Sequence, residues 1–152
     1  MMIRRLDPSE NPPWELLELA DPSKMIIEGY IHNSCIYVGE ESDEIIGVYV
    51  LKETKKIVVE IMNVAVQEIH QGRGIGKQLI SHAINEASKQ GYAQVEIGTG
   101  NSSIYQLKLY QQCGFRIVGV DFDYFVRSYD EPIYENGLLC RDMIRLSYTF
   151  ES

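Results

Sequence analysis

Apolar residues recur along this chain with two spacings, and together these predict an α/β fold. Helical spacing predicts helices at 14–20, 76–90 and 104–113, and Asp21 is placed to cap a further short helix. Alternating or continuous apolar runs predict strands at 1–6, 35–40, 44–52, 57–66, 93–99, 115–125 and 140–150. The order of these elements, with hairpins first and a strand–helix–strand crossover later, predicts a mixed sheet flanked by helices.

The stretch 57–66 is typical of a central strand, because it is apolar on both faces for much of its length. Only Glu60 and Asn63 interrupt it. The polar residues 41–44 predict a hairpin turn, and 127–137 reads as an acidic, polar loop.

Length and composition fit one domain that spans residues 1–152. The chain is 45% hydrophobic and 24% charged, which excludes a disordered segment or a coiled-coil rod. No apolar run approaches the ~20 residues that span a bilayer, and Met1–Asp7 lacks the apolar core of a secretory signal. The three cysteines lack the spacing of a disulfide framework or a metal site. We therefore expect a cytoplasmic protein without a metal and without a membrane partner.

The formal charge of −8 argues against nucleic acid as a partner, because an acidic surface repels phosphates. The same charge attracts cationic ligands.

A glycine-rich turn, Gln71–Gly76, connects the central strand to the helix at 76–90. Glycines allow positive φ and close backbone approach, and the free N–H groups of a helix start favour an anion such as a diphosphate. Arg73 and Lys77 add charge at this turn. The spacing fits neither the dinucleotide fingerprint nor the P-loop, so magnesium-dependent phosphoryl transfer is disfavoured. A tight strand-to-helix turn without a ligand is the alternative.

The same turn resembles the signature of the GNAT superfamily of acyl-CoA-dependent N-acyltransferases, Gln/Arg-x-x-Gly-x-Gly/Ala after a strand. Every fixed position of that signature is matched. Downstream, Leu109–Phe115 resembles the family's Leu-Tyr-x-x-x-Gly-Phe at the end of the second crossover helix. The two motifs occur in the right order on the right elements, and the resemblance extends from roughly residue 3 to residue 148.

The resemblance implies a GNAT-like mixed, splayed sheet of about six to seven strands with about four helices. Acetyl-CoA is then expected, as co-substrate, between the strands that end near Val66 and Thr99. The backbone groups implied for its acetyl, pantetheine and pyrophosphate portions belong to Val64, Ala65, Val66, Gln71, Gly72, Arg73, Gly74, Ile75, Gly76 and Lys77.

The second helix is expected to face the thioester with Ser103 and Tyr110. Many family members carry Asn seven residues before the tyrosine. Here Ser103 occupies that position and Asn101 lies two residues earlier, so both are assigned to the cofactor side. Helix capping is the alternative role for Ser103.

The implied reaction is direct attack of an amine on the thioester. Tyr110 is the candidate general acid toward the CoA sulfur, because a phenol is protonated at neutral pH; packing against the cofactor is the alternative. Glu60 is the candidate base, since some members carry a glutamate at this offset and burial would raise its pKa. The alternative for Glu60 is a solvated carboxylate. Asn63 cannot act as a base, so it either orients the substrate or a water or caps a β-bulge.

Acidic and aromatic residues interleave between residues 121 and 135, including Asp123 and Tyr124. This mixture suits a cationic amine, small-molecule or peptide, by charge pairing and cation–π contact; a solvated loop is the alternative. Many relatives are dimers, so a homodimer is an expectation from the resemblance alone. Two other functions compete with catalysis, namely a non-catalytic acyl-CoA-binding or sensing module on the same fold and a nucleotide-binding interaction domain.

Overall fold

The apolar stretches of the sequence form a seven-stranded mixed sheet in the computed structural model, which describes residues 1–151. The strand order is β1-β2-β3-β4-β5-β9-β6, and all neighbours are antiparallel except β4 and β5. A two-stranded ribbon of β7 and β8 stands apart from this sheet. The strands are β1 (Met2–Arg5), β2 (Cys35–Glu41), β3 (Glu44–Lys55), β4 (Val58–Val66), β5 (Gln94–Gly100), β6 (Arg116–Asp121), β7 (Tyr134–Glu135), β8 (Leu138–Leu139) and β9 (Met143–Thr149).

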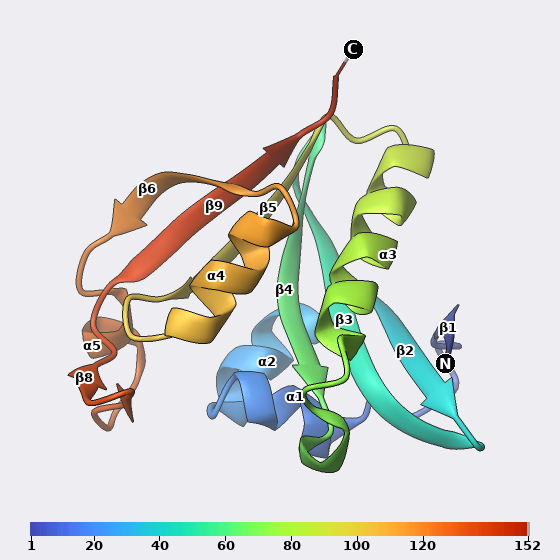
Figure 1. Cartoon of the computed structure of the whole chain (residues 1–152), viewed down its shortest axis with the longest axis horizontal. Coiled ribbons are helices and arrows are strands. Elements are labelled where there is room, and N and C mark those ends of the chain that lie inside the picture. The colour runs from blue at the N-terminus through green and yellow to red at the C-terminus, as the bar shows by residue number, and fades with distance from the viewer. Residues whose placement is uncertain (152) are drawn as a thin grey trace.

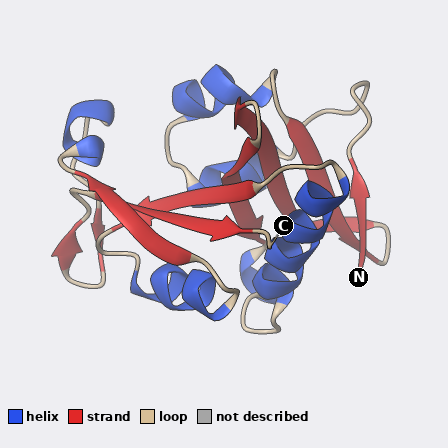
Figure 2. Cartoon of the chain, turned by 90° about the horizontal axis from the view of Figure 1, so that it is seen from above, coloured by secondary structure: helices blue, strands red, loops and turns tan. Residues whose placement is uncertain are grey.

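Helices cover both faces of the sheet, and each face has its own apolar core (Figure 2). On one face α1 (Trp14–Ala20) and α2 (Lys24–Ile31) pack through residues such as Leu17 and Ile27. On the other face α3 (Ile75–Lys89) and α4 (Ile104–Gln112) pack through Leu79, Ile80 and Tyr110. The short helices η1 (Glu68–His70) and α5 (Tyr124–Ser128) lie in connections. None of the helices formed by residues 1–151 is long and apolar enough to cross a membrane.

The two parallel strands separate after four residue pairs. Their register runs from Val58 opposite Gln94 to Ile61 opposite Ile97 and stops there. Beyond this point the strands diverge, as Figure 1 shows. From Met62 onward, the edge of β4 that faced β5 therefore has no strand partner.

A β-bulge in β4 coincides with this separation. Leu51 of β3 lies opposite Ile61 while Val50 lies opposite Asn63, so Met62 is the extra residue. As a result the side chains of β4 exchange faces: Ile61 packs in the α3–α4 core, whereas Ala65 packs in the α1–α2 core.

The predicted element order and the splayed mixed sheet are confirmed up to β6. The predicted strand 115–125 is wrong at its end, because Asp123 adopts a left-handed φ of 62° and α5 begins at Tyr124. The predicted loop 127–137 contains the end of α5 and strand β7. Ser23, not Asp21, caps α2, since its side chain accepts a hydrogen bond from Ile26 N at 3.2 Å.

Candidate active site

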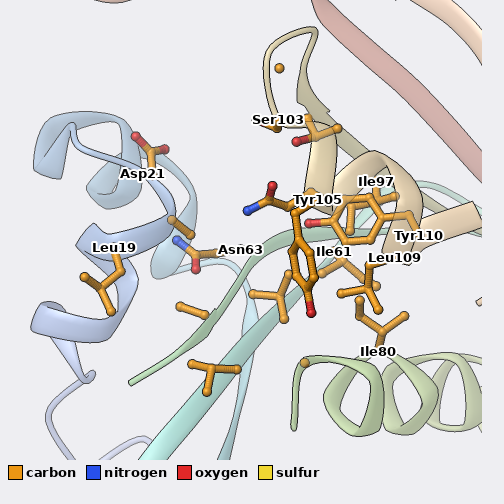
Figure 3. A pocket seen from close by; sticks show the side chains of 18 of the residues that line it. Leu19, Asp21, Ile61, Asn63, Ile80, Ile97, Ser103, Tyr105, Leu109 and Tyr110 are labelled. Carbon is orange, nitrogen blue, oxygen red and sulfur yellow. The ribbon is translucent and has the colours of Figure 1, made fainter. Parts of the chain in front are cut away.

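A cavity of about 510 Å³ lies where β4 and β5 separate (Figure 3). Its floor is β4 and β5, and the glycine turn, α4, the α1–α2 corner and the C-terminal segment form its walls. Among the predicted site residues, those that line the cavity are Asn63, Val64, Ala65, Val66, Gln71, Gly72, Gly74, Ile75, Gly76, Ser103 and Tyr110. One cavity thus brings together most of the residues that the two motifs singled out.

The glycine turn presents backbone N–H groups at one end of the cavity. Gly72 and Gly74 adopt left-handed φ angles of 83° and 78°, and a Cβ built on either would meet nothing within 4 Å. The turn leads into α3, whose first backbone bond runs from Gln78 N to Gly74 O, so the preceding N–H groups are unpaired within the helix. Such N–H groups at the positive end of the helix dipole form an anion site.

The side chains of the turn serve the scaffold instead of the cavity. Gln71 Nε2 donates to Val66 O at 3.0 Å and ties the turn to the end of β4. Arg73 donates to both carboxylate oxygens of Glu41, at 3.2 and 3.0 Å, and neither Arg73 nor Lys77 lines the cavity. The expected charge contribution of these two side chains is therefore not seen at the cavity.

Tyr110 projects from α4 with its hydroxyl toward the cavity (Figure 3). The residue is only 5% exposed, and its ring packs against Phe115 at a centroid distance of 6.3 Å. Burial raises the pKa of the Tyr110 hydroxyl well above its usual value near 10. The phenol is therefore neutral at physiological pH and can donate a proton or a hydrogen bond to a group in the cavity.

Glu60 lies outside the cavity, contrary to its predicted role as the base. It sits on the paired part of β4, and its carboxylate accepts two hydrogen bonds from Arg145 of β9 at 3.0 and 3.2 Å. The two side chains are only 17% and 26% exposed. The sequence could not show this ion pair, because its members are 85 residues apart.

Asn63 follows the bulge and lines the cavity from the α1–α2 side. Its Nδ2 donates to Leu17 O at 2.9 Å and to Tyr30 Oη at 3.1 Å. Its Oδ1 is buried and has no hydrogen-bond partner. Asn63 therefore links the bulged strand to α1 and α2 and keeps one acceptor unused.

The structure separates the two polar residues predicted at the start of α4. Ser103 is 6% exposed, lines the cavity and donates to Glu135 Oε1 at 2.9 Å. Asn101 does not line the cavity. Its amide donates to Leu139 O and accepts from the backbone N–H groups of Arg141 and Asp142, so it holds the C-terminal segment in place.

Of the three residues predicted on the acceptor side, Asn63 lines the cavity, whereas Asp123 and Tyr124 lie outside it. Asp123 is exposed and accepts a hydrogen bond from Arg141 Nε at 2.8 Å. Tyr124 packs edge-on against Phe125 at 5.0 Å, and it is Phe125 that lines the cavity. The segment 121–135 therefore does contribute to the cavity, but through residues such as Phe125 and Glu135 and not through Asp123 or Tyr124.

Two carboxylates that line the cavity were missed as site residues. The sequence predicts Asp21 only as a helix cap, and it predicts Glu135 only as one of the acidic residues between 121 and 135 that together suit a cationic amine. No local motif marks Asp21, since it reaches the cavity only because α1 and α2 meet there. Within residues 1–151 no group of three or more His, Cys, Asp or Glu side chains is arranged to hold a metal ion.

Comparisons with known proteins agree with this geometry. A family profile described as the acetyltransferase (GNAT) family matches residues 2–115. The chain is 55% identical over 133 residues to the uncharacterized N-acetyltransferase YvbK of Bacillus subtilis. The aligned region covers 88% of this chain and 86% of the relative.

Two solved structures share the whole architecture. An IAA acetyltransferase from Bacillus cereus superimposes with a TM-score of 0.94 at 52% identity, over 98% of this chain and 99% of that one. A GNAT family acetyltransferase from Elizabethkingia anophelis with acetyl-CoA bound superimposes with a TM-score of 0.96 at 43% identity, over 98% and 97% of the two chains.

Proposed function

Because the chain belongs to the acetyltransferase (GNAT) family, we propose that it transfers the acetyl group of acetyl-CoA to a small primary amine by direct attack. The family assignment makes the chain an acyl-CoA-dependent acetyltransferase.

The cavity suits acetyl-CoA at two places. The unpaired N–H groups of the glycine turn, from Gly72 to Lys77, would hold the pyrophosphate, whereas the N–H of Gln71 already donates to Glu68 O at 3.2 Å. The free edge of β4 at Val64, Ala65 and Val66 would hold the pantetheine and the acetyl carbonyl, because backbone groups there have no partner in β5.

When bound, acetyl-CoA supplies a thioester. The acceptor ammonium first releases one proton to solvent, and the resulting neutral amine attacks the thioester carbonyl carbon to give an acetamide and the CoA thiol. The Tyr110 hydroxyl is assigned to donate a proton to the departing sulfur and to regain one from solvent. A neutral donor at this point favours departure, since a thiolate with a pKa near ~8.5 gains from protonation at neutral pH. The observation that carries the proposal is the buried, protonated Tyr110 hydroxyl directed into the cavity.

Replacing Tyr110 with Phe tests this assignment. We expect kcat to fall by at least ~10-fold, because a positioned general acid contributes ~10²–10⁴-fold. The Kd for acetyl-CoA, measured by calorimetry, should change by less than ~2-fold, since the ring that packs in the core is retained.

Tyr134→Phe is the matched control, because Tyr134 is 70% exposed and does not line the cavity. Unchanged turnover in Tyr110→Phe would refute the acid role. A large loss of acetyl-CoA affinity would instead make Tyr110 a binding residue.

A further inference from the structure

Two carboxylates without a cationic partner line the cavity. The ion pairs among residues 1–151 involve other acids, such as Glu60 with Arg145 and Asp123 with Arg141, and none involves Asp21 or Glu135. No Lys or Arg of the described chain lines the cavity. The acidic charge of the cavity therefore has no Lys or Arg partner, whereas Asp121 and Asp123 of the neighbouring segment pair with Arg127 and Arg141.

Asp21 is held so that one carboxylate oxygen has no protein partner. Its Oδ1 accepts from Ser23 N at 3.1 Å and from Tyr129 Oη at 2.8 Å. Both donors are neutral and both use the same oxygen, so Oδ2 is left unbonded by residues 1–151. Tyr129 follows α5, and its bond to Asp21 joins the C-terminal segment to the α1–α2 corner across 108 positions of the sequence.

Glu135 has the same arrangement on the wall formed by α4. Its Oε1 accepts from Ser103 Oγ at 2.9 Å and from Ser102 Oγ at 3.5 Å, and its Oε2 has no partner among the described residues. Ser103 stands at the N-cap position of α4, the helix that carries Tyr110, but its side chain makes no capping hydrogen bond. Figure 3 shows Ser103 and Tyr110 on one side of the cavity and Asp21 with Asn63 on the other.

The Asn63 amide adds an unused acceptor on the Asp21 side. Leu17 O can only accept, so the amide nitrogen must face it, and this fixes which way the side chain points. The remaining Oδ1 is buried without a donor in a residue that is 4% exposed. Buried acceptors of this kind are rare in native proteins and call for a donor, and an ammonium group brings three N–H donors.

We propose that the acceptor is a primary amine that carries a second ammonium group, with Asp21 pairing the distal charge and Glu135 receiving the nitrogen that is acetylated. Oδ2 of Asp21 then binds the distal ammonium, on the side of the cavity that Asn63 also lines. This substrate class rests on the N-acetyltransferase function proposed above. Burial raises the pKa of Asp21, which reflects the cost of its charge when no cation is present.

Matched amines test the proposal through acceptor specificity. The probes are the α,ω-diamines from propane-1,3-diamine to hexane-1,6-diamine. Each diamine is compared with two compounds of matched chain length. In one, a methyl group replaces the second amino group and leaves a monoamine; in the other, a carboxylate replaces it and gives an amino acid. With acetyl-CoA saturating, we expect kcat/KM for the best diamine to exceed that of its monoamine at least ~10-fold, as a charge-assisted hydrogen bond in a partly buried site provides. The amino acid should be the poorest acceptor.

Asp21→Asn removes the charge and keeps an oxygen for Ser23 N and Tyr129 Oη. It should reduce kcat/KM for the diamine to that of the monoamine and leave the monoamine within ~3-fold of the wild type. Glu18→Gln is the control for general electrostatics, because Glu18 lies on α1, which ends just before Asp21, but is exposed and outside the cavity. Glu135→Gln should lower kcat/KM for both amines.

Equal use of diamine and monoamine, preference for the amino acid, or an unchanged diamine advantage in Asp21→Asn would overturn the inference. A binding measurement distinguishes failure of this inference from failure of the proposed function. In it, calorimetry compares the affinities of the best diamine and its monoamine for the CoA-loaded Tyr110→Phe protein. Binding at least ~10-fold tighter than the monoamine supports the acceptor class even if no amine is acetylated. Acetylation of all amines alike refutes the acceptor class and leaves the N-acetyltransferase function intact.

Discussion

Single residues around the cavity divide into those that hold the scaffold and those that keep a free polar atom. The side-chain amides of Gln71 and Asn101 donate hydrogen bonds to backbone carbonyls. By contrast, the Tyr110 hydroxyl and one carboxylate oxygen each of Asp21 and Glu135 are free to bind a ligand. The sequence predicted Tyr110, because a local motif places it on α4. It could not predict Asp21 or the pairing of Glu60, because the deciding partners, Tyr129 and Arg145, come from the far end of the chain.

Replacing Glu60 with Gln should reduce stability rather than turnover. Arg145 would lose its partner while remaining three-quarters buried. Breaking a fully buried pair costs about 3–5 kcal/mol and an exposed one far less, so about 1–3 kcal/mol is expected here. Thermal unfolding should then shift down by ~2–4 °C per kcal/mol. A fall in kcat of ~10-fold or more without a change in Tm would instead support Glu60 as the catalytic base.

The pH dependence of turnover reports on Tyr110. Its pKa is raised by burial, so the acid form persists from neutral pH to beyond the usual value near 10. We expect kcat to show no falling limb below about pH 10 that depends on this residue. Stopped assays of wild type and Tyr110→Phe across pH 6 to about 10 measure it. A limb near about pH 8 that is present only in the wild type would contradict this assignment.

At the scale of elements, the site exists because two parallel strands stop pairing and a helix begins beside the gap. The sequence predicted β4, the glycine turn and α3 closely, since continuous apolar residues, positive-φ glycines and helical periodicity are all local signals. The bulge at Met62 and the end of pairing at Ile97 depend on register between strands, and local patterns do not report register. The apolar pattern of residues 115–125 also did not predict α5, because it does not show that Asp123 adopts a left-handed backbone conformation.

Replacing Gly74 with Glu should abolish acetyl-CoA binding. A side chain at φ 78° is strained, and its carboxylate would occupy the place of the pyrophosphate. The Kd for acetyl-CoA should rise at least ~100-fold, as measured by calorimetry.

Gly91→Glu is a matched control at the other end of α3. Gly91 also has a positive φ, of 85°, with nothing near its Cβ position, so the backbone strain is similar. The two variants should lose similar stability, and Gly91→Glu should bind acetyl-CoA normally. Equal affinities in both variants would place the pyrophosphate elsewhere.

At the scale of the whole molecule, an acidic chain with a net charge of −8 surrounds a cavity that contains unpaired carboxylates. Composition predicts a preference for cationic ligands, but it does not indicate Asp21 or Glu135, the residues to which we assign that preference. Local patterns contain no direct signal for the C-terminal ribbon and α5, which bring Glu135 to the start of α4 and Tyr129 to the α1–α2 corner. Their short elements have weak periodicity and are stabilised by contacts with distant segments.

Raising the salt concentration should weaken the use of dicationic acceptors more than that of monocationic ones. Screening shortens the reach of charges from ~10 Å at ~0.1 M to ~3 Å at ~1 M. With acetyl-CoA saturating, kcat/KM for a diamine should therefore fall more steeply with NaCl than that for its monoamine, while kcat stays constant. Parallel slopes for the two amines would show that the acidic field does not select the acceptor.

The most direct test of the account is a mass spectrum of the products after the wild-type protein is incubated with acetyl-CoA and butane-1,4-diamine. The account predicts a mono-acetylated diamine formed in equal amount to free CoA, at a rate that Tyr110→Phe reduces at least ~10-fold. Tight binding of acetyl-CoA without acetylation of this or any other amine would contradict it, and would identify the chain as an acyl-CoA-binding module on the same fold.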